Sequence, residues 1–367
     1  MHKRFVANIV SRICLVVCFI MTAPLGWAVY DNARSRETWA FIISISAGIV
    51  IAATIFFVFR LKKEDYQKIN AKDGLAIVGL SWLSLSFLGA LPLFLSGVVP
   101  TFTDGFFEIT SGFTTTGATI FTDVEILPRG ILFWRSLTHW LGGMGIIVLY
   151  IALLPALGTN AFQLYKAEAP GITAERIEPQ IKETAKHLWG VYFIFTFLEI
   201  LLLMVGDMPL FDATCHTFGT MATGGFSTKN ASIGAYSPYI QWVVIVFMIL
   251  AGMNFILHYQ WIKGRPRALF HDEEFRYYAS LICVLVPVFA FVLMQAGLSA
   301  HPFRDAAFQV VSIMTTTGYT TANFDVWPHA LRFALVLLMF IGGCGGSTGG
   351  GMKMVRILLS VKVAFCS

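Results

Sequence analysis

A short threonine- and glycine-rich sequence occurs three times in the chain. It reads T-T-T-G-A-T at residues 114–119, A-T-G-G-F-S at residues 222–227 and T-T-T-G-Y-T at residues 315–320. Glycine adopts backbone conformations that other residues resist, so a strand of this kind can turn successive carbonyl oxygens toward one axis. Rings of carbonyl oxygens can replace the water around a cation. Several such strands around one axis would therefore coordinate a cation, whereas a single strand would coordinate it poorly.

An aspartate precedes each copy at a constant distance. Asp104, Asp212 and Asp305 each lie 13 positions before the glycine at the fourth place of their copy. The intervening chain has room for about ten helical residues, or about 15 Å, which is half of a hydrocarbon core. Each repeat therefore predicts a membrane helix, a short helix that stops at mid-membrane, a strand and a second membrane helix. The aspartates are expected to cap the short helices and complement their dipoles rather than bind ions.

The composition indicates an integral membrane protein. Hydrophobic residues make up 56% of the chain and charged residues 13%, and the mean hydropathy is +0.71, which is too apolar for a water-soluble domain of this size. Apolar runs long enough to span a bilayer occur near residues 8–30, 39–60, 73–98, 130–155, 187–206, 237–259, 277–298 and 329–359. We expect an all-α polytopic membrane protein built from tandem helix, pore loop, helix repeats similar to potassium channel subunits.

The basic residues indicate the orientation. About 19 of the 26 Lys and Arg fall on the side of the amino terminus, including Lys3, Arg4, Arg60, Lys263 and Arg265, and such an excess marks the cytoplasmic side. This bias explains the net charge of +5 better than nucleic-acid binding does. Acidic residues outnumber basic ones on the other side, where they would concentrate cations.

The run at residues 329–359 is interrupted by G-G-C-G-G-S-T-G-G-G at residues 342–351, and seven glycines in ten residues do not hold a regular helix. A Walker phosphate-binding loop is a weak alternative, since Lys353 follows Met352 and no Gly-Lys-Ser/Thr sequence is present. We expect a movable gate across a pore. Its residues are Gly342, Gly343, Gly345, Gly346, Ser347, Thr348, Gly349, Gly350 and Gly351.

Together, the three strands, the interrupted helix and the extra pair of helices before the first repeat resemble the TrkH-type potassium uptake subunit of the Trk/Ktr/HKT superfamily. The resemblance implies potassium and rubidium uptake across the bacterial inner membrane, a homodimer with one pore in each protomer, and cytoplasmic TrkA-like nucleotide-binding regulatory subunits. It also implies that glycine in the filter favours potassium, since a serine in the first repeat accompanies sodium transport in the superfamily. The implied K⁺-binding residues are Thr114, Thr115, Thr116, Gly117, Ala222, Thr223, Gly224, Gly225, Thr315, Thr316, Thr317 and Gly318.

The resemblance also suggests boundaries. Residues 1–70 would form a two-helix membrane segment, residues 71–165 the first pore repeat, residues 166–270 the second and residues 271–367 the third. The family has a fourth repeat, and the sequence ends soon after the third closes. We therefore expect the fourth repeat to be absent, and we do not assume that the chain conducts alone.

An intramembrane transferase is the alternative from another functional class. It would use His139 or His216 with a nearby carboxylate, but the sequence shows no compact catalytic cluster. The six cysteines contain no Cys-x-x-Cys pair, so neither a disulfide framework nor a zinc site is expected. We predict a transporter, with no catalytic residues and no cofactor other than the K⁺ it carries.

Overall fold

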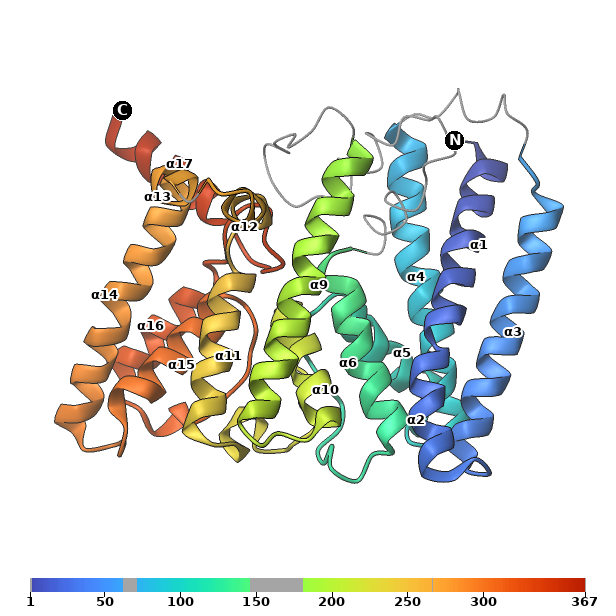
Figure 1. Cartoon of the computed structure of the whole chain (residues 1–367), viewed down its shortest axis with the longest axis horizontal. Coiled ribbons are helices and arrows are strands. Elements are labelled where there is room, and N and C mark those ends of the chain that lie inside the picture. Colours follow the sequence, from blue (N-terminus) through green and yellow to red (C-terminus); the bar gives the residue numbers. More distant parts are fainter. Residues whose placement is uncertain (1, 62–70, 146–180, 266, 367) are drawn as a thin grey trace. The chain divides into compact units, whose positions relative to one another are not determined.

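The described part of the chain is almost entirely helical. The structure is a computed structural model, and it describes residues 2–61, 71–145, 181–265 and 267–366. Within these ranges the only β contact is an isolated bridge between Ile341 and Met352, and the helices are labelled in Figure 1. The expected all-α fold class is confirmed. The chain divides into two compact units: unit 1 comprises residues 1–169 and 178–186, and unit 2 the remainder.

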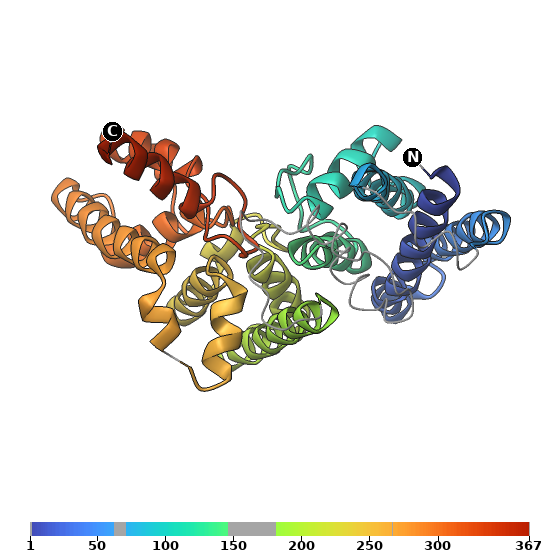
Figure 2. The same ribbon diagram turned by 90° about the horizontal axis from the view of Figure 1, so that it is seen from above.

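Unit 1 contains a bundle of long helices followed by the elements of the first predicted repeat. Its helices are α1 (Lys3–Ile20), α2 (Thr22–Asn32), α3 (Arg36–Val58), α4 (Ala71–Ser96), α5 (Phe102–Phe113) and α6 (Arg129–Gly143). Helices α1, α3 and α4 pack against one another, and Figure 2 looks down this bundle at the blue end of the chain. α3 begins where Ser35 Oγ accepts a hydrogen bond from Thr38 N at 3.1 Å, which satisfies a free N–H group of its first turn.

Unit 2 contains the elements of the second and third predicted repeats. Its α-helices are α9 (Ile181–Val205), of which residues 181–186 are assigned to unit 1, α10 (Leu210–Met221), α11 (Pro238–Ala251), α12 (Phe255–Ile262), α13 (Arg267–His271), α14 (Glu273–Ala296), α15 (Pro302–Met314), α16 (His329–Met339) and α17 (Met354–Cys366). Two 3-10 helices lie at Ser232–Ala235 (η2) and Phe324–Val326 (η3). The core of this unit surrounds α15, whose side chains Phe308, Val311 and Met314 are fully buried.

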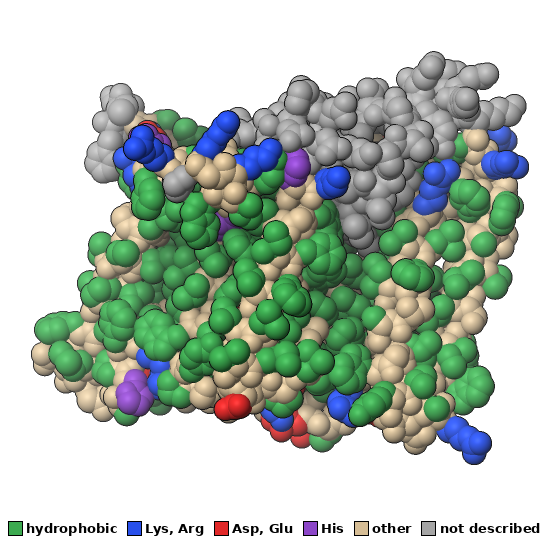
Figure 3. Space-filling model, viewed as in Figure 1, with side chains coloured by type: hydrophobic (Ala, Val, Ile, Leu, Met, Phe, Trp, Pro, Cys, Tyr) green, Lys and Arg blue, Asp and Glu red, His purple; other side chains and the backbone are tan. Residues whose placement is uncertain are grey.

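Five helices in the described part are long and apolar enough to span a membrane. They cover Lys3–Asn32, in which α1 and α2 are counted together, Arg36–Val58, Lys72–Ser96, Ala185–Val205 and Glu273–Ala296. These match five of the expected runs, and Figure 3 shows apolar side chains along their flanks. The run expected at 130–155 lies partly outside the described residues. The chain is thus a polytopic membrane protein.

The apolar run expected to span the membrane at residues 237–259 does not form one continuous helix. α11 ends at Ala251, α12 begins at Phe255, and their axes differ by 100°. Gly252 has a low helix propensity, and Asn254 caps the new helix by accepting a hydrogen bond from Ile256 N at 2.9 Å. The chain therefore turns sharply where a straight membrane helix was expected.

Three short helices lead into the threonine- and glycine-rich strands, as the sequence predicted. α5, α10 and α15 contain 12, 12 and 13 residues, too few to cross a hydrocarbon core of about 30 Å at 1.5 Å per residue. α5 packs against α4 and α6. The approach of α4 is close because Gly89 has no side chain; a β-carbon there would lie 2.8 Å from Ile109 Cγ2.

Candidate functional site

The three repeated segments, residues 114–117, 222–225 and 315–318, form no β-ladder and are called strands here for their extended course. They share one backbone conformation. Their first residues follow the short helices with φ of −83, −83 and −82°. The residues with positive φ are Thr115, Thr223 and Thr316 at the second position (53, 52 and 60°) and Gly117, Gly225 and Gly318 at the fourth (75, 80 and 85°). The third residues are outside this region. A backbone that alternates in this way directs its carbonyl groups to one side, as cation coordination by carbonyl oxygens requires.

Each short helix also ends in the same set of hydrogen bonds. In the third repeat, Thr316 N donates to Ile313 O at 3.0 Å and Thr317 N donates to Ser312 O at 2.9 Å. The equivalent amides of the other two repeats bond to carbonyls three and five positions earlier in the same way. This is a Schellman ending, in which glycine usually occupies the left-handed position. A threonine there costs about 1 to 2 kcal/mol, so these positions are strained in all three repeats.

Threonine hydroxyls stiffen two of the strands. The Oγ1 atoms of Thr114 and Thr116 lie 2.8 Å apart in the first repeat, and those of Thr315 and Thr317 lie 2.8 Å apart in the third. The second repeat has alanine and glycine at these positions. The first and third strands are therefore held by a side-chain bond that the second strand lacks.

The second and third strands lie together in unit 2, while the first belongs to unit 1. A β-carbon on Gly225 would lie 2.1 Å from Thr317 O, so the two backbones meet at a place where only glycine fits. Tyr319 is fully buried, and its hydroxyl bonds to His216 O at 2.9 Å and Phe226 O at 3.1 Å. The third strand is thus bonded directly to the second repeat.

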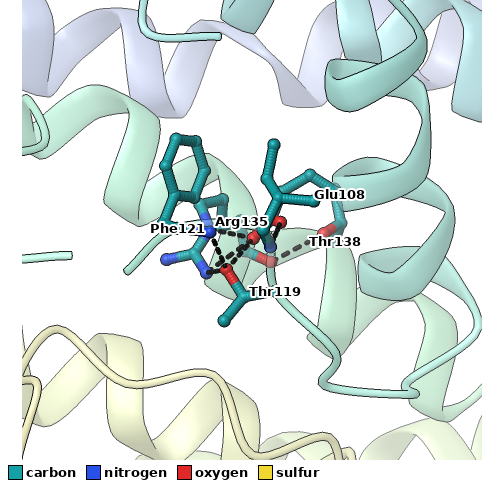
Figure 4. Close-up of polar contacts among 6 residues, drawn as sticks. Glu108, Thr119, Phe121, Arg135 and Thr138 are labelled. Carbon is teal, nitrogen blue, oxygen red and sulfur yellow. Dashed lines mark hydrogen bonds and ion pairs between the residues drawn. The ribbon is translucent and has the colours of Figure 1, made fainter. Parts of the chain in front are cut away.

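A buried ion pair supports the first strand from behind (Figure 4). Glu108 on α5 and Arg135 on α6 are 0% and 1% exposed, and Arg135 Nη2 lies 2.6 Å from Glu108 Oε1. The carboxylate also accepts hydrogen bonds from Thr119 Oγ1 at 2.9 Å and Ile120 N at 3.0 Å. The guanidinium lies over the Phe121 ring, 5.3 Å from its centre. These contacts fix the end of the strand to both neighbouring helices.

In the second repeat a histidine, His216, binds the end of the strand in place of a glutamate. His216 occupies the same register as Glu108, four residues after the repeat's aspartate. Its Nδ1 lies 2.8 Å from Asp212 O and its Nε2 lies 2.9 Å from Ser227 Oγ. Because a carbonyl can only accept, Nδ1 donates to Asp212 O, and neutral Nε2 accepts from the Ser227 hydroxyl. The neighbouring Tyr236 phenol has a raised pKa, mainly because it is buried and secondly because the negative Asp212 carboxylate is near.

The three aspartates lie in the first turns of the short helices, but they are not the N-cap residues. Asp104 Oδ2 instead accepts from Thr101 Oγ1, the actual N-cap, at 2.7 Å. Asp305 Oδ2 accepts from Ser299 Oγ at 2.5 Å, and Asp212 Oδ1 accepts from a threonine hydroxyl that follows the second strand, at 2.6 Å. Their charges complement the helix dipoles, while the expected capping role was wrong in detail.

The glycine-rich loop joins α16 to α17 and closes on itself. α16 ends at Met339 and helix resumes at Met354, so the predicted interruption is confirmed. At the base of the loop, Gly342 N donates to Met352 O at 2.9 Å, and Met352 N donates to Phe340 O at 3.2 Å. The loop is therefore a closed, hydrogen-bonded excursion from a broken helix.

Two hydrogen bonds attach this loop to the starts of the second and third strands. Thr348 Oγ1 donates to Met221 O, the last residue of α10, at 3.0 Å. Gly350 N donates to Thr316 Oγ1 at 2.7 Å. The second bond gives a reason for a threonine at the strained position of the third strand, since glycine would offer no acceptor there.

Several glycines of the loop allow close packing. A β-carbon on Gly342 would lie 1.9 Å from Gly350 O, and one on Gly343 would lie 2.7 Å from Gly252 O. Gly252 lies at the break between α11 and α12, and its carbonyl accepts a hydrogen bond from Cys344 N at 2.8 Å. Glycine is thus required here for contact between backbones, in addition to the flexibility expected from the sequence.

Two charged side chains hold the loop. Lys353 is buried, and its Nζ donates to Gly349 O and, at 3.3 Å, to Ser347 O. Glu274 Oε1, at the start of α14, accepts from Gly345 N at 2.7 Å. In the sequence, the position of Lys353 only argued against a Walker phosphate-binding loop. Its burial within the glycine-rich loop was not predicted.

Similar short sequences at or just after the ends of α6, α11 and α16 form a second repeat that was not predicted. G-G-M-G at residues 142–145, A-G-M-N at residues 251–254 and G-G-C-G at residues 342–345 begin 24 to 26 positions after the fourth residue of the preceding strand. A β-carbon on Gly142 would lie 2.1 Å from Phe113 O, so the first of these sequences also packs against its short helix. Arg135 was missed too, although an arginine within an apolar run predicts a buried partner.

The structure gives no support to an intramembrane enzyme. His139 lies on α6 of unit 1, and His216 on α10 is occupied by Ser227 and a backbone carbonyl. Within the described ranges, no group of three or more His, Cys, Asp or Glu side chains could hold a metal ion. The feature that all three repeats share in the described part is the backbone geometry of their threonine- and glycine-rich strands.

Comparisons with known proteins agree with the fold. Residues 48–365 match the TrkH family, described as a cation transport protein. The chain is 40% identical to the Trk system potassium uptake protein TrkH of Salmonella typhimurium, over 99% of this chain and 75% of that protein. It is 33% identical to the Trk system potassium uptake protein TrkG of Escherichia coli, over 98% and 75%. The crystal structure of the potassium transporter TrkH from Vibrio parahaemolyticus superposes with a TM-score of 0.85 at 36% identity, covering 100% of this chain and 76% of that one.

Proposed function

The chain belongs to the TrkH family of cation transport proteins, and we propose that it takes up potassium, and rubidium as a close analogue, through a filter formed by its threonine- and glycine-rich strands. The observation that carries this proposal is the shared alternation of φ at the second and fourth positions of all three strands. Carbonyl oxygens directed to one side can replace the water around K⁺ as it enters.

The ligands would be the backbone oxygens of residues 114–117, 222–225 and 315–318. Each strand follows the carboxyl end of a short helix, where the helix dipole places partial negative charge and so favours a cation. The bonds behind the strands, from Glu108 in the first repeat and His216 in the second, keep the oxygens in place. A filter that cannot contract around a smaller ion would favour K⁺ over Na⁺.

We further propose that residues 342–351 are the gate. The bonds from Thr348 to Met221 and from Gly350 to Thr316 join the loop to the starts of two strands. The Lys353 ammonium within the loop adds a positive charge that would oppose the passage of a cation. Opening would require these bonds to break and the loop to move aside.

The remaining assignments follow the family. We propose a bacterial inner-membrane location with a cytoplasmic amino terminus, a homodimer, and a TrkA-like nucleotide-binding subunit docked on the cytoplasmic side. Arg265 and Arg267 are exposed beyond α12 and offer part of that docking face. Charge reversal at both should reduce co-purification of the regulatory subunit, and undiminished co-purification would remove this loop from the interface.

Rubidium uptake tests the function. Cells that lack other potassium uptake systems would express the chain, or a fusion that adds a fourth repeat after Ser367, and ⁸⁶Rb⁺ entry would be measured with K⁺ or Na⁺ as competitor. We expect entry in the fusion, with K⁺ competing far better than Na⁺. Membrane-inserted fusion protein that carries no Rb⁺, or for which Na⁺ competes equally, would contradict the proposal.

A further inference from the structure

A groove on unit 1, away from the strands, has the features of a specific binding site. α1, α3 and α4 surround a cavity of about 600 Å³. Its walls are apolar, with Val10 from α1, Ile51 from α3 and Phe87 from α4 among them, and Lys3 lies at one end. Ile51 and Phe87 are 58% and 56% exposed, so the groove is open along its side.

The groove is long enough to hold an acyl chain of a lipid. Along α1 its lining runs from Lys3, at the first residue of the helix, to Cys14. This stretch rises about 16 Å at 1.5 Å per residue, close to half of a hydrocarbon core of about 30 Å. The lining of α4 runs from Leu80 to Leu91 and lies deeper, because Asp73 near the start of α4 is level with His2, whose N–H it binds. The groove therefore begins beside Lys3 at the membrane surface and continues past the midplane.

The mouth of the groove is basic. Among the described residues, the exposed cations at this end are Lys3, Arg4, Arg60 and Lys72, and Figure 3 shows Lys and Arg side chains there above the apolar flanks. Asn8 Nδ2 donates to Phe59 O at 3.0 Å, which keeps the end of α3, and hence Arg60, beside α1. Asp73 is buried and accepts from His2 N at 2.7 Å, so its charge is already engaged by α1.

We propose that this groove binds one anionic phospholipid of the cytoplasmic leaflet, with an acyl chain between α1, α3 and α4 and the headgroup phosphate at Lys3. The leaflet assignment rests on the cytoplasmic amino terminus of the proposed function. The cytoplasmic leaflet carries the anionic lipids that attract basic clusters at a membrane surface. A second copy of the chain fits less well, because symmetric pairing of this face would bring its basic mouth against the same charges.

Native mass spectrometry of the purified chain tests the site. Phosphatidylglycerol and phosphatidylcholine are titrated separately into delipidated protein in detergent, and bound lipid is counted. Lys3→Ala removes the charge at the mouth. Val10→Trp and Ser84→Phe fill the groove from α1 and α4 respectively. Lys263→Ala is the matched control, since this exposed lysine lies beyond α12 in unit 2.

We expect the wild type and Lys263→Ala to bind one phosphatidylglycerol in preference to phosphatidylcholine. Lys3→Ala should weaken this binding about fivefold, the effect of one basic residue near an anionic surface, and either groove-filling variant should abolish it. Equal affinity for the two lipids, or unchanged binding in Lys3→Ala and in both folded groove variants, would overturn the proposal. So would loss of a dimer, rather than of lipid, in the groove variants. Lipid counting needs no ion flux, so its outcome is independent of the transport assay.

Discussion

The buried pair behind the first strand gives the sharpest prediction on stability and selectivity. Arg135→Met removes a guanidinium that approaches Glu108 Oε1 from Nε at 2.7 Å and from Nη2 at 2.6 Å. The Glu108 side chain is 0% exposed and would remain as a buried carboxylate without its counter-ion. The variant also loses the bond from Arg135 Nη2 to Thr119 Oγ1 at 3.1 Å, one of the bonds that hold the end of the strand.

The expected loss is large because desolvation is no longer compensated. Removing one partner of a buried ion pair costs about 3 to 5 kcal/mol, most of it from the charge left behind. The double variant Glu108→Gln with Arg135→Met removes both charges, and neutral replacements of a buried pair are often close to neutral in stability. The double variant should therefore recover most of the stability. The end of the strand would still lack its bond to Arg135 and one of the two hydrogen bonds that the Glu108 carboxylate accepts. The K⁺ over Na⁺ preference of the double variant should stay reduced.

Thermal unfolding in detergent measures the first effect, and ⁸⁶Rb⁺ entry with Na⁺ competition in a four-repeat fusion measures the second. Arg12→Met is the matched control, since Arg12 also lies within an apolar helix but bonds to Asn8 Oδ1 at 2.9 Å, away from the strands. A double variant as unstable as Arg135→Met would refute the ion-pair reasoning. Wild-type ion preference in both variants would show that this pair does not position the strand.

Three further predictions follow from single residues. Gly225→Ala should abolish flux, because the new β-carbon would lie 2.1 Å from Thr317 O. The control is Gly264→Ala, where φ is a similar 77° but the space around the residue is open. Its backbone strain of about 1 to 2 kcal/mol should leave ⁸⁶Rb⁺ entry within about twofold of wild type. Lys353→Gln should raise basal flux, because hydrogen bonds from a charged donor, worth about 1.5 to 3 kcal/mol, no longer hold the loop; unchanged flux in vesicles without regulatory subunit would argue against Lys353 as a latch. Gly117→Ser should lower the K⁺ to Na⁺ permeability ratio measured under bi-ionic conditions, and an unaltered ratio would count against the first strand as a filter element.

The repeats were predictable from the sequence because they depend on local chemistry. A threonine- and glycine-rich strand after a short apolar helix is visible in the letters, and so is a stretch of seven glycines that no helix can hold. Five spanning helices followed from length and hydropathy alone. These features are set by backbone propensity and by the bilayer, so they need no knowledge of tertiary contacts.

What the sequence did not reveal depends on contacts between distant segments. The 100° turn after α11 is stabilised by Asn254 and by the loop amide that bonds to Gly252 O, and a hydropathy window averages over so short a break. The second role of Thr316, as acceptor for Gly350 N across 34 residues, has no local signature. Arg135 was visible in principle as a charge in an apolar run, and the repeated short sequences at the ends of α6, α11 and α16 were visible from their similar spacing.

The most direct test of the filter is to see the ion. Crystals of the four-repeat fusion grown in RbCl would be measured at the rubidium absorption edge, and an anomalous difference map would locate bound Rb⁺. The proposal predicts peaks beside the carbonyl oxygens of the three strands, at Gly117, Gly225 and Gly318 and the residues before them, and weaker peaks when excess NaCl is added. Rubidium peaks that lie only at surface carboxylates, with none beside the three strands, would contradict it.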